Sequence, residues 1–355
     1  MDDFSPGTWF LAANSAEGFY SAYDDIAQPE NADRVWYIKG GPGNGKSTFM
    51  RRIAEAAEAA GFHAEYFLCS GDPMSLDGIR IRENKTVYVD ATAPHVQEPS
   101  LPGVSGRYLD LSQFYKKTAL PDRQAILALQ SAYRKEYDRA YALLCAAGKA
   151  DPTAFLSGED CDALRAAGYE TAARLLPEGD GGGIVRRFLS ANTCLGFISI
   201  PQNAAAFGKV YLIQSDLAHA WLSGVLDASA EKRQSVILCP DPLLPGRPDG
   251  VIVPGAGVSF LKAHKGIRYP NGSVLRIRPE CRDAEKTPEY RPEKSLRSAL
   301  LRQACFRLKK AKELHDNLET LYRPSVDFKR LDRFTEKHIR EQFGTDGNMT
   351  SDTKQ

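Results

Sequence analysis

Eight consecutive residues have the types and the spacing of a loop that binds phosphate groups. The pattern G-x-x-x-x-G-K-[ST] is matched at every fixed position by Gly40-Gly41-Pro42-Gly43-Asn44-Gly45-Lys46-Ser47. Glycines allow the backbone to turn its N–H groups inward around phosphate oxygens, with no side chains in the way. Lys46 supplies a full positive charge, and the hydroxyl of Ser47 is suited to hold Mg²⁺. The pattern therefore predicts a site for the phosphates of a nucleotide.

The residues on either side of this loop fit the same chemistry. An apolar strand is expected at Arg34–Lys39, and an amphipathic helix is expected at Ser47–Ala60. A helix that begins at the loop adds the partial positive charge of its amino terminus to the site. We therefore expect Gly40–Thr48 to bind a nucleoside triphosphate with Mg²⁺. ATP is the expected nucleotide, because the sequence has no Asn-Lys-x-Asp motif for guanine.

An acid downstream of the loop is a candidate for metal binding. Asp90 ends an expected strand, Lys85–Asp90. An acid at the carboxyl end of a strand beside the loop can hold Mg²⁺ through water, which is the Walker B role. We assign Lys46 and Asp90 to catalysis, and Ser47 and Asp90 to the metal. Ala91 follows where many motor ATPases have a glutamate, which favours a slow, switch-like or kinase-like site; the alternative is that Asp90 only caps a turn.

The loop Cys69–Gly78 offers two further acids, Asp72 and Asp77. Ligand sites of open parallel sheets lie at the carboxyl ends of the strands, so these acids can position water or an acceptor hydroxyl. We assign Asp72 to catalysis on this basis. Asp-Pro and Asp-Gly are also ordinary turn dipeptides, so a structural role stays open. His95, soon after Asp90, is either a neighbour of the γ-phosphate or a solvated loop residue.

An internal duplication organises the chain. Phe10–Phe19 and Phe188–Phe197 are identical at six of ten positions. Further matches follow in the same order, pairing Val35–Ile38 with Val210–Ile213, Asp72-Pro73 with Asp241-Pro242, and Asp77-Gly78 with Asp249-Gly250. Such a repeat indicates two copies of one structural unit. Each copy is expected to begin with a short helix, because Asn14 and Glu17 resemble a helix cap and its reciprocal partner.

The second copy lacks the phosphate loop. Its counterpart, Gln214–His219, contains no glycine and no lysine, and Leu261 takes the place of Asp90 in the alignment. We therefore expect this copy to bind no nucleotide in this way. It can pack on the first copy, carry a partner surface, or contribute a residue to the first site. The candidates for that last role are His219, Lys262, His264 and Lys265.

Strands that alternate with helices predict a mainly parallel sheet covered on both faces. We expect an α/β protein of two tandem P-loop NTPase-like domains, each a three-layer α/β/α unit followed by a helical segment. The glycine-rich run Glu178–Gly183 marks the expected boundary. The expected limits are 1–183 for the active domain with a helical segment at about 120–178, 184–344 for the degenerate domain with helices at about 292–343, and 345–355 for a disordered tail.

Two long amphipathic helices are expected within these segments, at Gln124–Gly148 and Ser295–Tyr322. Their apolar residues recur near the helical period. The ordinary interpretation is that each helix packs on its own domain. The alternative is a surface for a partner or a nucleic acid, which the charged residues Lys309, Lys310 and Lys312 leave open.

The composition favours a cytoplasmic protein. The net charge is +1, which provides no overall field to attract nucleic acid or an anionic membrane. No run of about 18 apolar residues predicts a transmembrane helix, and the acidic start Met1–Phe4 does not resemble a signal peptide. The seven cysteines are scattered, without Cys-x-x-Cys spacing. We therefore expect reduced thiols and neither a disulfide framework nor a zinc site.

At its motifs the chain resembles a bacterial family of tandem P-loop ATPase-like proteins, within the P-loop NTPase superfamily. The resemblance rests on Gly40–Thr48, Cys69–Gly78, Asp90–His95 and Lys312–Glu319, and it covers most of the chain. It implies ATP binding and ATPase activity, but it implies no substrate. In that family the second copy often keeps its own P-loop, whereas here that loop is degenerate, so a mechanism with two sites is not expected.

Three functions remain open at this point. The leading one is an ATPase or ATP-dependent switch, in which hydrolysis changes the relation between the two domains. The second is a kinase that transfers phosphate to a small molecule or a nucleotide, with the acceptor near Asp72, Asp77 and His95. The third is a non-enzymatic, nucleotide-dependent scaffold that binds a protein partner.

Overall fold

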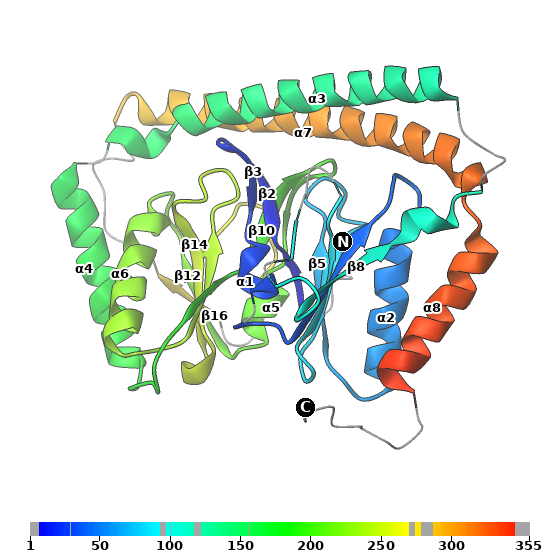
Figure 1. The fold of residues 1–355 in the computed structure, drawn as a ribbon. Coiled ribbons are helices and arrows are strands. Elements are labelled where there is room, and N and C mark those ends of the chain that lie inside the picture. The colour runs from blue at the N-terminus through cyan, green and yellow to red at the C-terminus, as the bar shows by residue number, and fades with distance from the viewer. Residues whose placement is uncertain are drawn as a thin grey trace.

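The computed structural model describes residues 7–28, 30–92, 97–99, 101–116, 122–155, 157–269, 274–277 and 287–344. These residues form two six-stranded sheets, one from each half of the chain, with helices packed on their outer sides (Figure 1). Two long helices lie side by side across the top of both sheets (Figure 1). His95 and the tail 345–355, for which the sequence makes predictions, lie outside the described residues.

The first sheet has the strand order β1-β5-β6-β7-β4-β8. Its strands are β1 (Thr8–Phe10), β4 (Arg34–Lys39), β5 (Ala64–Leu68), β6 (Leu76–Ile81), β7 (Thr86–Asp90) and β8 (Gly106–Asp110). All neighbours are parallel except β6, which runs antiparallel to β5 and β7. The α/β class is confirmed, and the strands predicted at Arg34–Lys39 and Lys85–Asp90 are confirmed as β4 and β7. The sequence predicts a loop where β6 begins, because Asp77-Gly78 has the composition of a turn.

The second sheet repeats this arrangement strand for strand. Its order is β16-β12-β15-β14-β13-β9, and again one strand, β14, is antiparallel to both its neighbours. The strands are β9 (Ile184–Arg186), β12 (Lys209–Ile213), β13 (Val236–Pro240), β14 (Pro248–Val253), β15 (Val258–Lys262) and β16 (Val274–Ile277). Each strand has a counterpart at the same place in the first sheet. This correspondence confirms the duplication found in the sequence.

A β-hairpin follows the first strand of each repeat, so the short helix predicted from Asn14 and Glu17 is wrong. The hairpins are β2 (Ala12–Ser15) with β3 (Gly18–Ser21), and β10 (Ser190–Thr193) with β11 (Gly196–Ser199). Ser15 Oγ accepts a hydrogen bond from Glu17 N at 3.1 Å and donates one to Gly18 O at 2.8 Å. These bonds hold a hairpin turn, because the next residues reverse and pair with β2. Short helices follow the hairpins, α1 (Asp24–Ala27) and α5 (Gln202–Ala205).

The two repeats meet through reciprocal contacts. Phe10 N donates to Phe188 O at 3.0 Å, and Phe188 N donates to Phe10 O at 2.9 Å. Asn14 Nδ2 donates to Asn192 O at 3.0 Å, and Asn192 Nδ2 donates to Asn14 O at 3.5 Å. Each hydrogen bond from the first repeat to the second is matched by the equivalent bond in the opposite direction, as in a symmetric dimer. A shared apolar core takes buried side chains from both repeats and joins the two sheets.

The long helices exchange between the repeats. In the first repeat, α2 (Lys46–Ala59) packs on its own sheet, and α3 (Arg123–Lys149) and α4 (Gly158–Leu175) follow the last strand. The second repeat has the same series, α6 (Ala218–Glu231), α7 (Tyr290–Tyr322) and α8 (Phe328–Phe343). Helix α3 packs along α7, whereas α4 packs on α6 and α8 packs on α2 (Figure 1). Each repeat therefore lays its last helix on the sheet helix of the other repeat.

This exchange differs from the expectation that each helix packs on its own domain. The contact between α4 and α6 is close, because a Cβ on Gly168 would lie 1.9 Å from Trp221 O and one on Gly224 would lie 1.8 Å from Arg165 O. The boundary predicted at Glu178–Gly183 falls between α4 and β9. Helices from each side of this boundary pack on the other side, so the boundary stays a prediction.

Four short 3₁₀ helices complete the described fold: η1 (Leu111–Phe114), η2 (Pro152–Phe155), η3 (Pro254–Ala256) and η5 (Arg323–Ser325). In the part of the chain that the structure describes, no helix is both long enough and apolar enough to cross a membrane. The six described cysteines are free thiols.

Candidate functional site

The predicted phosphate loop connects the end of β4 to the start of α2. Gly43 and Gly45 have φ angles of +66° and +82°, which side chains disfavour, so glycine is required at both positions. The N–H groups of Gly43, Asn44 and Gly45 donate no hydrogen bond to any residue that the structure describes. Helix α2 begins at Lys46, and its amino terminus faces the same loop. This backbone provides N–H donors and a helix dipole for an anion.

The structure brings Lys46 and Asp90 together. Strand β7 pairs with β4 so that Asp90 lies opposite Ile38, immediately before the loop. Lys46 Nζ lies 3.6 Å from Asp90 Oδ2, and both side chains are largely buried. Lys46 Nζ also donates to Gly40 O at 2.8 Å and to Gly41 O at 3.1 Å. The ammonium group is therefore held at the loop by oxygens that a phosphate group can replace.

Asp90 makes a different contact with each of its two carboxylate oxygens. Its Oδ1 accepts a hydrogen bond from Thr92 N at 2.9 Å, so it does cap the turn after β7. Its Oδ2 faces Lys46. Thr92 Oγ1 in turn donates to Gly40 O at 3.1 Å, which ties this turn to the start of the phosphate loop. The capping contact thus fixes the second carboxylate oxygen beside the loop.

Ser47 and Thr48 lie on the first turn of α2 but face different surroundings. Ser47 Oγ accepts a hydrogen bond from Leu76 N at 2.9 Å, at the start of β6. Its hydroxyl keeps further capacity for a metal ion, because a hydroxyl has two lone pairs. Thr48 is exposed and borders a small pocket on the outer side of the loop.

Asp72 lies in the turn between β5 and β6 and is fully engaged there. Its Oδ1 accepts from Met74 N at 3.1 Å, and its Oδ2 accepts from Ser75 Oγ at 3.1 Å. Lys312 Nζ, from α7, lies 3.4 Å from the same Oδ2. These contacts support the structural alternative, and the catalytic assignment of Asp72 stays a prediction.

Asp77 and Cys69 lie in the same part of the site and are buried together. Burial raises the pKa of the Cys69 thiol well above its ordinary value, and the Asp77 carboxylate adds to the effect. Tyr23 is also buried here, and burial followed by Asp77 raises the pKa of its hydroxyl. A thiol with a raised pKa stays protonated at neutral pH, so Cys69 has no nucleophilic thiolate.

Helix α7 of the second repeat brings residues to this site that the sequence prediction missed. A Cβ on Gly43 would lie 3.1 Å from Arg323 Cγ and 3.1 Å from Glu319 O. His315 Nδ1 lies 3.6 Å from a Glu319 carboxylate oxygen. Burial lowers the pKa of His315, although Glu319 opposes the shift, and the charges of Lys312 and Lys46 lower it further. Their helical spacing places these residues on one face, but nothing in the sequence links that face to the loop.

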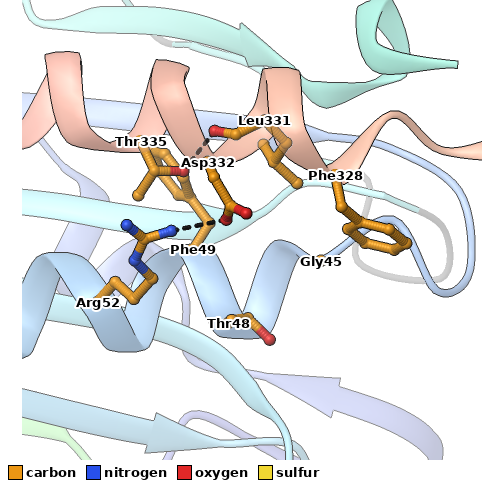
Figure 2. Close-up of a pocket in the computed structure, with 8 residues that line it drawn as sticks. All are labelled: Gly45, Thr48, Phe49, Arg52, Phe328, Leu331, Asp332 and Thr335. Carbon is orange, nitrogen blue, oxygen red and sulfur yellow. Dashed lines mark hydrogen bonds and ion pairs between the residues drawn. The ribbon is translucent and has the colours of Figure 1, made fainter.

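A small pocket lies between α2 and α8, beside the end of the phosphate loop (Figure 2). Arg52 of α2 binds Asp332 of α8 through an Nη1 to Oδ1 contact of 2.9 Å (Figure 2). A Cβ on Gly45 would lie 3.1 Å from Leu331 Cδ2, so α8 supports the loop from behind. Neither Lys46 nor Asp90 lines this pocket, and we assign it no role in nucleotide binding.

The corresponding edge of the second sheet carries a different set of charges. Strand register pairs Ile213 with Lys262, as it pairs Ile38 with Asp90, so Lys262 and not Leu261 is the counterpart of Asp90. Lys262 Nζ lies 3.5 Å from Asp241 Oδ2 and 3.8 Å from Asp249 Oδ1. The sequence alignment was wrong by one residue, because the lengths of the connecting loops differ between the copies.

The rest of the second site is filled by its own side chains. Asp216, in the segment that replaces the phosphate loop, accepts hydrogen bonds from Tyr290 and Lys294 of α7. His264 Nε2 lies 2.7 Å from Asp249 Oδ2. Burial lowers the pKa of His219 to about 4, with a smaller effect of nearby cations. Lys262 and His264 thus bind acids of their own repeat and do not reach the first site.

The chain has no match among protein-family models, curated proteins or solved structures. Within the described residues, no group of three or more His, Cys, Asp and Glu side chains is placed to hold a metal ion. A Mg²⁺ ion bound with a nucleotide needs only one or two protein ligands, because water and phosphate oxygens supply the others. The pair of Ser47 and Asp90 fits this limited requirement.

Proposed function

We propose that this protein binds ATP with Mg²⁺ at Gly40–Thr48 and hydrolyses it. The observation that carries the proposal is the position of Lys46, whose ammonium group lies between two loop carbonyls and Asp90. These contacts join a glycine-rich anion loop, a helix amino terminus, one cation and one strand-end acid in a single place. Each of these elements has a separate role in binding a triphosphate with its metal ion.

The roles follow from the geometry. The N–H groups of Gly43, Asn44 and Gly45 bind the phosphate oxygens, and Lys46 exchanges its carbonyl partners for the β- and γ-phosphates. Ser47 and Asp90 are the residues that would hold Mg²⁺ bound with the nucleotide. The bound ion supplies charge neutralisation at the phosphates during attack by water. Catalysis at such a site depends mainly on position and electrostatic stabilisation.

One observation favours hydrolysis over transfer to a small-molecule acceptor. The kinase alternative places the acceptor near Asp72, and that carboxylate is bound by its own turn and by Lys312. Phosphate release from ATP without any added acceptor therefore tests the ATPase proposal directly. Formation of ADP only in the presence of a metabolite supports the kinase, and tight binding without turnover supports the scaffold.

The loop itself is tested by Lys46→Ala. Removal of the ammonium group is expected to weaken ATP binding about 100-fold, since a hydrogen bond from a charged donor contributes up to about 3 kcal/mol. Isothermal titration calorimetry with Mg²⁺ and ATP measures the change. The control is Lys329→Ala, which removes an exposed lysine at the start of α8. Equal affinity in the wild type and Lys46→Ala contradicts the site.

A further inference from the structure

The last turn of α7 forms part of the wall around the phosphate loop, although α7 belongs to the second repeat. Gly43 contacts both the backbone of Glu319 and the aliphatic part of Arg323, each at 3.1 Å from the position of a Cβ. The contact involves Cγ of Arg323, two bonds before the start of its guanidinium group.

The backbone around Arg323 is fixed against the first repeat. Lys116 N donates to Ser325 O at 2.7 Å, and Asp327 N donates to Phe114 O at 2.8 Å. Within η5, Val326 N donates to Arg323 O at 3.1 Å. These bonds join the chain after α7 to the segment that follows β8, which borders the loop on one side. Arg323 is therefore positioned by main-chain contacts and not by its own side chain.

Arg323 differs from the other cations at the site because its charge has no acidic partner in the described part of the chain. Lys46 is paired with Asp90, and Lys312 is paired with Asp72. The described part of the chain provides neither an ion pair nor a hydrogen bond for the Arg323 side chain, which is exposed. A cation without a partner beside an anion loop is free to bind an anionic ligand, and the planar guanidinium fork suits phosphoryl oxygens.

The turn that follows α3 in the first repeat can be compared with the turn at Arg323, which follows α7 in the second. Helix α3 is followed by η2 as α7 is followed by η5, and η2 packs against α7 of the second repeat. Asp151, at the start of that turn, lies 2.6 Å from Arg247 Nη1 and 3.2 Å from Arg297 Nη2. The ends of α3 and α7 thus each place a charged residue against the other repeat. At the end of α3 that charge is already paired, and at the end of α7, within the described residues, it is not.

We propose that Arg323 binds the terminal phosphate of ATP held by Gly40–Thr48 and stabilises the negative charge that develops there during hydrolysis. The second repeat, which has no phosphate loop, thereby completes the site of the first repeat. This inference rests on the proposed function of that loop. Arginines placed at a transferring phosphoryl group raise kcat by about 10³- to 10⁵-fold in other P-loop enzymes.

The test compares Arg323→Ala and Arg323→Lys with Arg302→Ala, which removes an exposed arginine nearer the start of α7. For Arg323→Ala we expect kcat to fall at least about 100-fold, with weaker binding of ADP–aluminium fluoride and unchanged affinity for ADP. Arg323→Lys is expected to recover only part of the rate, because lysine lacks the planar fork. Arg302→Ala is expected to behave as the wild type.

Two results overturn the inference. The first is an unchanged kcat in Arg323→Ala while Lys46→Ala loses ATP binding, which leaves the proposed function intact. The second is an equal loss of ADP and ATP affinity together with a lower thermal unfolding temperature, which assigns Arg323 to packing alone. A wild-type protein that binds no ATP is a failure of the proposed function itself, and calorimetry on the wild type identifies that case first.

Discussion

At the scale of single residues, the two repeats carry opposite charges at equivalent positions. Asp90 and Lys262 occupy the same strand register, and each faces a partner of opposite sign. Burial lowers the pKa of Lys262, but the carboxylates of Asp241 and Asp249 outweigh burial and hold it above its ordinary value. A permanent cation at this place repels Mg²⁺. The second site is therefore unsuited to a metal–nucleotide complex by charge as well as by its missing loop.

Asp90→Asn separates metal-dependent catalysis from nucleotide binding. We expect ATP turnover with Mg²⁺ to fall about 10- to 100-fold, because the neutral amide holds the water around the ion less strongly. The affinity for ATP is expected to change less than turnover, since Lys46 and the loop N–H groups remain. Steady-state kinetics and calorimetry on the same sample measure both effects.

The control for this variant is Asp110→Asn. Asp110 ends β8, the other neighbour of β4, and its Oδ1 accepts from Ser112 N at 2.8 Å, a cap that asparagine also forms. This substitution is expected to leave turnover near the wild-type rate. If Asp90→Asn and Asp110→Asn have the same turnover, Asp90 has no part in the reaction.

Single residues could be predicted from the sequence where a short contiguous pattern specifies the chemistry. The glycines, Lys46 and Ser47 lie within one such pattern, and Asp90 follows from its place at the end of a strand. Arg323 and Lys312 could not be predicted as site residues, because their position depends on a helix that crosses from the other repeat. Lys262 was misplaced by one position, because only strand register defines its counterpart.

At the scale of elements, α8 is the support of the phosphate loop. Its buried face packs on α2, where the ring of Phe334 lies 6.3 Å from that of Phe49 and 5.3 Å from that of Phe114. Leu331 is 5% exposed and contacts the loop at Gly45. The helix that carries the nucleotide site therefore depends on a helix from the opposite end of the chain for its outer packing.

Leu331→Ala tests this support. Loss of the buried side chain is expected to lower the free energy of unfolding by about 2–4 kcal/mol, because the cavity cannot fully close. Lys337→Ala, on the solvent side of the same helix, is expected to change it by no more than about 0.5 kcal/mol. Urea unfolding followed by circular dichroism measures both. Similar stability of the two variants contradicts the packing of α8 on α2.

Prediction of elements succeeded where the apolar period was strong and failed where turn residues lie inside strands. The helices at Gln124–Gly148 and Ser295–Tyr322 are confirmed within a few residues as α3 and α7. Strand β6 was missed because Asp77-Gly78 favours a turn in isolation, whereas pairing with two neighbours makes it a strand. The partner of each long helix was also beyond prediction, since an amphipathic pattern does not identify the surface that it covers.

At the scale of the whole molecule, the two repeats are joined by helices that cross between them and by a shared core. Helix α4 leaves the first repeat to cover α6, and α8 leaves the second repeat to cover α2 (Figure 1). The hairpins and the shared core join the repeats along their common face. Helices α7 and α8 thus belong to the second repeat but lie against the phosphate loop of the first.

The interlocked arrangement is tested by cutting the connection between the repeats. A protease site inserted between Asp180 and Gly181, both exposed, divides the chain after α4 and before β9. The two fragments are expected to elute together at the volume of the uncut protein in size-exclusion chromatography, because each carries a helix that covers the other. The uncut insertion variant is the control for the effect of the insertion alone. If the cut fragments separate in native buffer, the exchange of α4 and α8 does not hold the repeats together.

If they stay together, addition of Leu331→Ala to the cut chain distinguishes the role of α8 from that of the shared core. The fragments should then dissociate at a lower urea concentration than those of the cut chain without this substitution, since one of the exchanged helix contacts has been weakened.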